Sequence, residues 1–73
     1  MRGAVKISLN DFNGALIDLN KAIELDNSDG YMYHYRGIAK NKLGDTKSAC
    51  LDIEKAIELG YEEARETLKE ICK

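Results

Sequence analysis

Apolar residues recur every three or four positions along most of this chain, a spacing that puts them on one face of an α-helix. The pattern predicts five helical segments, at residues 2–9, about 12–25, about 29–43, about 46–59 and about 62–72. No stretch of the sequence alternates apolar and polar residues with a period of two, so we expect no β-strand. The predicted fold class is therefore all-α.

Residue types that favour helix ends mark the boundaries between these segments. Asp11 and Asp45 precede the second and fourth segments and suit N-caps, because a carboxylate accepts hydrogen bonds from the first free backbone N–H groups. Gly44 and Gly60 follow the third and fourth segments, where glycine readily closes a helix. Residues 26–30 combine aspartate, asparagine, serine and glycine, which predicts a turn between the second and third helices.

The first part of the chain returns in the second part with an offset of 34 positions. The matching pairs include Arg2 and Arg36, Gly3 and Gly37, Lys6 and Lys40, Asp11 and Asp45, Ala15 and Ala49, Asp18 and Asp52, together with the sequence KAIEL at residues 21–25 and 55–59. A fixed period of this length is typical of helix–turn–helix units that stack into a solenoid. Such stacks present a concave surface, and their usual function is binding.

Small residues at repeated positions predict close packing of the helices. They are Gly3 and Gly37 on one helix of each unit, and Ala15, Ala22, Ala49 and Ala56 on the other. Glycine inside a helix costs about 1 kcal/mol relative to alanine. Its repetition one period apart therefore indicates a close helix approach, with axes about 8–10 Å apart.

These repeated residues resemble the tetratricopeptide repeat family. In a second repeat taken as residues 30–63, the marked positions of the family fall on Tyr33, Arg36, Gly37, Lys40, Ala49, Ile53, Ala56 and Tyr61, and in the first repeat on Gly3, Lys6, Ala15, Leu19, Ala22 and Asn27. Arg36 replaces the leucine of the family, Lys40 an aromatic residue, and Asn27 and Tyr61 a proline. These departures weaken the turn chemistry and the outer packing, and they leave the small-residue contact intact.

The resemblance implies a single domain over residues 1–73, built as a tetratricopeptide-like superhelix of about five antiparallel helices. Residues 1–29 would form a first repeat that lacks its opening positions, residues 30–63 a complete repeat, and residues 61–73 a capping helix with a polar outer face. Ile71 stands where a further repeat would need glycine, so the stacking signal ends there.

In this family the first helix of each repeat lines a concave groove that holds a protein segment. The resemblance implies groove positions at Tyr31, His34, Tyr35, Ile38, Asn41, Lys42, Arg65 and Lys69, with Ala4, Ile7, Ser8 and Leu68 beside them. Tyrosine offers a large contact area, and lysine or arginine pairs with a carboxylate. Alternatively, the aromatic cluster at residues 31–35 packs against a neighbouring helix or a second subunit. The carboxylate clamp of some members is not expected, because Ala4 and Tyr35 stand where it requires asparagine.

The net charge and the distribution of apolar residues argue against two classes of binding partner. The chain has 73 residues and a net charge of −2, so it has no basic excess for binding nucleic acid. No apolar run approaches the ~18 residues needed to cross a membrane, and the N-terminal residues lack the apolar core of a secretory signal. We therefore expect neither a nucleic-acid nor a membrane partner, and we expect a cytoplasmic location.

The cysteines and the single histidine do not form a recognisable chemical site. Cys50 and Cys72 lack the spacing of a metal knuckle, and only His34 is available to join them. A disulfide remains possible, but the favoured interpretation makes Cys50, at the position of Leu16 in the first repeat, a small apolar core residue. Reduced thiols also suit a cytosolic chain. The acidic pairs are assigned to caps and solvated faces, namely Asp11 with Asp18, and Glu62 with Glu63.

Two functional hypotheses follow. The first is a non-enzymatic module, without metal or cofactor, that binds a protein or peptide in the concave groove. The alternative is a structural module that homo-oligomerises, with a second chain completing the truncated first repeat. The small size supports this alternative, because a core of this size rarely supplies more than about 3–5 kcal/mol of stability.

Overall fold

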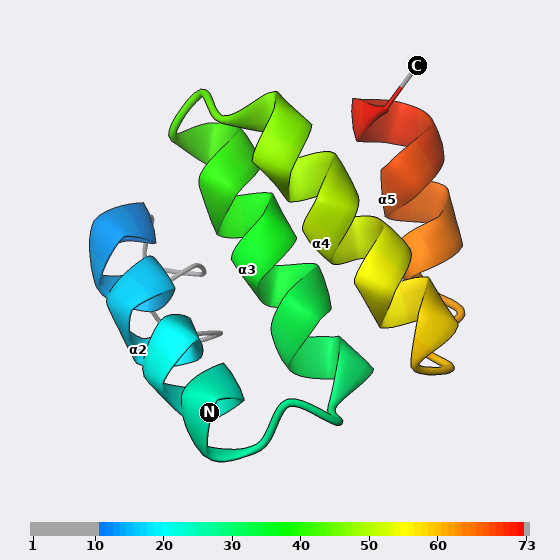
Figure 1. Ribbon diagram of the computed structural model, residues 1–73. Helices are drawn as coiled ribbons and strands as arrows, with labels where there is room; N and C mark the ends of the chain where they lie inside the picture. The colour runs from blue at the N-terminus through cyan, green and yellow to red at the C-terminus, as the bar shows by residue number, and fades with distance from the viewer. Residues whose placement is uncertain (1–10, 73) are drawn as a thin grey trace.

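The computed structural model describes residues 11–72, and this part of the chain forms four α-helices and no strand. The helices are α2 (Phe12–Leu25), α3 (Gly30–Lys42), α4 (Thr46–Glu58) and α5 (Ala64–Ile71). Each helix packs on the next one in the chain, and Figure 1 shows neighbours running in opposite directions with α3 and α4 in the middle. The all-α prediction is confirmed. The helix expected at residues 2–9 lies outside the described residues.

The predicted cap residues set the helix boundaries. Asp11 and Asp45 each accept a hydrogen bond from the backbone N–H three residues later, at 3.0 and 3.2 Å, so both N-cap predictions are confirmed. Gly44 and Gly60 have φ values of +94° and +95°, the left-handed conformation in which glycine closes a helix. The last helix begins two residues later than expected, after a turn at residues 62–63.

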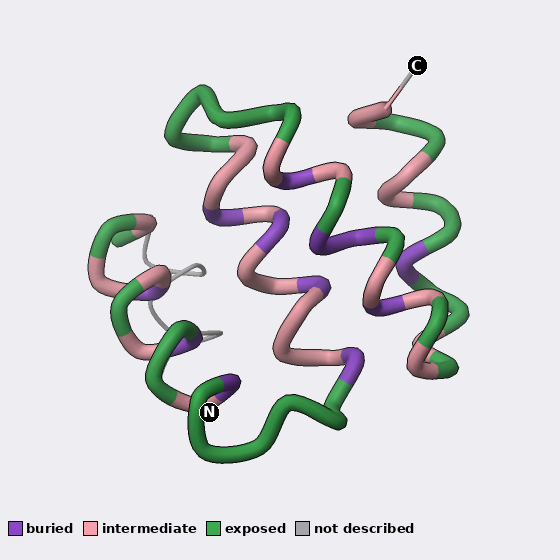
Figure 2. The backbone as a smooth tube through the Cα atoms, viewed as in Figure 1, coloured by how far each residue is buried: buried purple, intermediate pink, exposed green. Residues whose placement is uncertain are grey.

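The core consists mainly of alanine, with a few larger aliphatic side chains. The buried apolar residues are Ala15, Leu19, Ile23, Ala39, Ala49, Ile53, Ala56 and Ala64. Figure 2 shows buried positions on the faces where neighbouring helices meet. Because small side chains dominate these faces, the helices can approach one another closely.

Gly37 lies at a close approach between α3 and α4. A Cβ atom at this position would lie 2.6 Å from Cδ1 of Ile53 and 3.0 Å from the carbonyl oxygen of Ala49. Both distances are shorter than ordinary contacts, so the prediction of a close glycine–alanine crossing is confirmed here. Its counterpart Gly3 lies outside the described residues.

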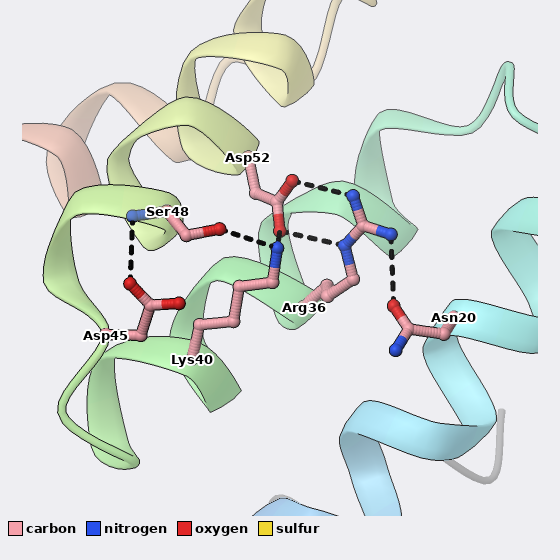
Figure 3. Close-up of polar contacts among 6 residues, drawn as sticks. All are labelled: Asn20, Arg36, Lys40, Asp45, Ser48 and Asp52. Atoms are coloured by element: carbon pink, nitrogen blue, oxygen red, sulfur yellow. Dashed lines mark hydrogen bonds and ion pairs between the residues drawn. The ribbon is translucent and has the colours of Figure 1, made fainter.

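A network of side chains around one buried carboxylate joins α2, α3 and α4 (Figure 3). Asp52 on α4 is 6% exposed, and its two oxygens accept hydrogen bonds from Arg36 at 2.8 Å each. Lys40 Nζ lies 2.9 Å from the same carboxylate and donates to Ser48 Oγ at 2.9 Å. Arg36 also reaches α2, where Asn20 Oδ1 accepts a hydrogen bond at 3.1 Å. Arg36 and Lys40 therefore supply ion-pair contacts where the repeat pattern has apolar packing.

The acidic residues assigned to caps and solvated faces divide into two groups. Asp11 caps α2, and Glu62 and Glu63 are exposed, as predicted. Asp18 is only partly exposed, and one oxygen of its carboxylate is shielded from solvent. Asp18 stands 34 positions before the buried Asp52, and both residues lie on helices that pack against α3.

Cys50 and Cys72 form a disulfide, so the interpretation of Cys50 as an unpaired core residue is wrong. Their Cα atoms lie 5.9 Å apart, and Cys50 is only partly buried on the side of α4 that faces α5. The bond fastens the C-terminal end of α5, a helix of eight residues among which only Ala64 is buried. It also removes the argument from free thiols for a reducing compartment.

Candidate functional site

Three aromatic rings cluster on one face of α3. Tyr31, His34 and Tyr35 stand three and four positions apart, so the helix brings them to the same side. The ring centroids of Tyr31 and Tyr35 are 4.5 Å apart, and those of His34 and Tyr35 are 5.1 Å apart. Since Arg36 lies about 200° around the helix from His34, the ion-pair network occupies roughly the opposite side of α3.

Tyr61, in the turn between α4 and α5, adds a fourth aromatic ring to this cluster. Its ring is 5.0 Å from His34 and 5.6 Å from Tyr31, and it meets Tyr31 at an interplanar angle of 86°. The Tyr61 hydroxyl donates a hydrogen bond to Glu63 Oε2 at 3.0 Å. Burial of the ring, with this hydrogen bond, raises the pKa of Tyr61 to about 12. The phenol is therefore neutral at physiological pH.

His34 connects the cluster to α5. Its side chain is 7% exposed, and its Nε2 lies 2.8 Å from Thr67 Oγ1. Burial lowers the pKa of His34, which keeps the ring neutral at neutral pH. His34 therefore packs between α3 and α5, as the alternative interpretation of the aromatic cluster expects. It contacts the rings of Tyr35 and Tyr61 but has little exposed surface itself.

A hollow of about 400 Å³ opens beside Tyr31 and Tyr61, where α3 begins and α4 ends. Its lining residues are Asp26, Ser28, Asp29, Gly30, Tyr31, Leu59, Gly60 and Tyr61. The hollow is formed by two turns, residues 26–29 and 59–61, which meet because Gly30 packs on the end of α4. A Cβ on Gly30 would lie 2.8 Å from the carbonyl oxygen of Ala56, so a larger residue would push the turns apart.

The other predicted groove residues take no part in these ring contacts. Asn41 accepts a hydrogen bond from Thr46 Oγ1 at 3.0 Å and so belongs to the turn between α3 and α4. Ile38 is partly buried. The remaining three are exposed cations, of which Arg65 pairs with Glu62 in the adjoining turn: Lys42, Arg65 and Lys69. Within residues 11–72, no hydrogen bond joins any of these five to the aromatic cluster.

Sequence reasoning missed several residues that complete the site. Tyr61 stands where the family has proline, and this departure gave no indication that its ring would join the aromatic cluster. Asp26 and Asp29 were predicted only as part of the turn at residues 26–30, and Thr67 carried no sequence signal of its own. Their contribution depends on how the two turns and α5 meet in space.

The described residues offer little for other chemistries. Among them, no group of histidine, cysteine, aspartate and glutamate is arranged to hold a metal ion. Both cysteines are consumed by the disulfide. Within residues 11–72, no helix combines the length and the apolar character needed to traverse a bilayer.

Comparison with known proteins does not assign the chain to a family. No protein-family model, no curated protein and no solved structure matches the chain.

Proposed function

We propose that this chain is a tetratricopeptide-like interaction module that binds a protein segment across the aromatic surface of α3. The observation that carries the proposal is the continuous set of partly exposed tyrosine rings, Tyr31, Tyr35 and Tyr61, next to a hollow of about 400 Å³. Tyrosines of this kind are common anchors at interfaces, because each buries a large ring and loses few rotatable bonds.

Buried residues beneath the tyrosine rings hold this surface in place, which favours binding. His34 is buried and bonded to Thr67, so the rings that flank it are held in place before a partner arrives. A preorganised surface loses less conformational entropy on binding than a flexible one. The ion pairs of Asp52 and the disulfide further fix the helices that carry these residues.

The repeat interpretation rests on three features. The sequence repeats with an offset of 34 positions, successive helices pack antiparallel in chain order, and Gly37 meets Ala49 and Ile53 closely. Each is typical of stacked helical hairpins, whose concave faces bind partners. The proposed role is binding, without a catalytic group, metal or cofactor.

A selection from a library of random peptides displayed on phage tests this proposal. The immobilised chain is expected to enrich peptides, whose affinities are then measured by isothermal titration calorimetry. Tyr31→Ala is expected to weaken binding by tenfold or more, since truncating an interface tyrosine commonly costs about 2 kcal/mol. Leu51→Ala is the matched control, because Leu51 is an apolar side chain, 63% exposed, on α4.

The expected pattern is loss of affinity in the Tyr31 variant and wild-type affinity in the Leu51 variant, with unchanged helical circular dichroism in both. The reverse pattern would place the binding surface around Leu51 on α4. Absence of any enriched peptide would remove the support for peptide binding.

Self-association is a second candidate, favoured by apolar side chains exposed on α2 and α4. Ile17 and Leu51 stand one period apart and are 69% and 63% exposed, and Leu25 is 81% exposed. Exposed apolar side chains of this kind are often covered by a second subunit when they form a continuous patch. Sedimentation velocity at several concentrations tests the idea, and a monomer over the whole range would reject it.

A further inference from the structure

The hollow beside Tyr31 carries two carboxylates at its rim. Asp26 accepts hydrogen bonds from the backbone and hydroxyl of Ser28, and Asp29 accepts one from the backbone N–H of Tyr31. All of these bonds use Oδ1, so within residues 11–72 they leave Oδ2 of both aspartates for another donor. The hydrogen bonds from Ser28 lower the pKa of Asp26, which is therefore ionised at neutral pH.

The same hollow also has two aromatic residues in its lining. Tyr31 and Tyr61 both line it, and their rings stand nearly perpendicular, with centroids 5.6 Å apart. The face of an aromatic ring carries partial negative charge and attracts a lysine or arginine head group. Two perpendicular rings thus offer a cation a corner, independently of the aspartates.

The helix that ends at the hollow adds a third attraction for positive charge. α4 ends at Glu58, and the next two residues, Leu59 and Gly60, line the hollow. The C-terminal end of a helix carries partial negative charge. The opposing positive end of α3 is covered by Asp29, which caps the Tyr31 N–H.

Two of the described positive groups near these turns are paired with other residues. Lys55, in the last turn of α4, lies 3.6 Å from Glu58, and Arg65 is paired with Glu62. The chain as a whole has a net charge of −2. Neither Lys55 nor Arg65 lines the hollow.

We propose that the hollow formed by Asp26, Asp29, Tyr31 and Tyr61 receives a lysine or arginine side chain of the bound protein segment. This inference rests on the proposed function, because it names the chemistry of the partner at the same aromatic surface. The flexible stem of either side chain would lie along the tyrosine rings, while its charged head meets the two carboxylates.

Two random-peptide libraries of equal diversity separate this inference from the proposed function. One library lacks lysine and arginine, and the other lacks aspartate and glutamate. The structure predicts that the second library yields the binders, each with a shared lysine or arginine. Replacing that residue by the uncharged norleucine or citrulline should weaken binding about tenfold, as expected for a lost ion pair and cation–π contact.

Charge-neutralising variants supply the matched test on the protein. Asp26→Asn with Asp29→Asn removes both charges, while asparagine preserves the turn and cap hydrogen bonds. The double variant should bind the selected peptides about tenfold more weakly, and its affinity should depend less on the salt concentration. Glu24→Gln with Glu54→Gln removes two exposed charges from outside the hollow and should leave affinity unchanged.

The outcomes distinguish the two claims. Binders that arise equally from the library without cations, and that still depend on Tyr31, would overturn the cationic ligand and keep the proposed function. Equal effects of both charge variants would also overturn it, since they would reflect overall charge. Binders that are indifferent to Tyr31→Ala would overturn both.

Discussion

Removal of the Cys50–Cys72 disulfide should destabilise the chain strongly. The bond joins α4 to the end of α5 across a sequence separation of 22 residues. The loss of loop-closure entropy in the unfolded chain is about 11 cal/mol/K for a loop of this length, which corresponds to about 3 kcal/mol at room temperature. A domain of this size has a total stability of only about 4–11 kcal/mol, so the bond accounts for a large share of it.

The perturbation is Cys50→Ser with Cys72→Ser, followed by urea and thermal unfolding with far-UV circular dichroism. The expected loss of about 3 kcal/mol lowers the melting temperature by roughly 12–24 °C for a domain of this size. Reduction of the wild-type protein should give the same loss. The control is reduction of the double variant, which has no disulfide and should not change.

Two results would refute this reasoning. Titration of two reactive thiols in the unreduced protein would show that the bond does not form. Equal free energies of unfolding in the wild type and the double variant would show that it adds nothing to the packing of α5 on α4.

Three further perturbations test the packing and the charges of the fold. Asp52→Asn should destabilise by about 2–4 kcal/mol, because it leaves Arg36 short of a partner near the core, whereas exposed Glu58→Gln should cost less than about 0.5 kcal/mol; urea unfolding measures both. Gly37→Ala should cost about 1–2 kcal/mol in the same assay despite better helix propensity, and a stabilised variant would contradict the close approach. For His34 the folded-state pKa lies below the ordinary 6.5, so the unfolded chain binds more protons and stability falls as the pH drops below that value. Comparison of unfolding at about pH 7.5 and pH 5.5 should show a smaller change in His34→Gln, and equal slopes would reject the buried neutral ring.

Local sequence signals predicted most of the helices and their ends. Helix periodicity and cap chemistry act within a few residues, so Asp11, Asp45, Gly44 and Gly60 indicated the boundaries without knowledge of the fold. The close approach at Gly37 was also predictable, because the repeat placed small residues on both helices that meet there.

Contacts between residues far apart in the sequence were harder to predict. The pairing of Cys50 with Cys72 depends on where the end of α5 lies along α4, and the comparison of repeats pointed instead to the apolar Leu16. Asp52 carried a usable signal, because Arg36, Lys40 and Asp52 each have an identical residue one period earlier. Three charges repeated together suggest a buried network, but that inference requires knowing that they share one helix interface.

The aromatic site was predicted in part. The resemblance placed Tyr31, His34 and Tyr35 among the groove positions, and their rings do lie together on α3, since residues three and four apart share a face. The burial of His34 and the involvement of Tyr61 depend on the turn before α5, which has no counterpart in the helical pattern.

Nuclear magnetic resonance provides the most direct test of partner binding at this surface. A lysine- or arginine-containing peptide from the phage selection is titrated into the isotopically labelled chain, and shifts of the backbone amide signals are mapped. The account predicts the largest changes at residues 26–35 and 59–61, with little change along the exposed sides of α2 and α4 near Ile17 and Leu51. The largest changes near Ile17 and Leu51, with the aromatic surface unaffected, would contradict it.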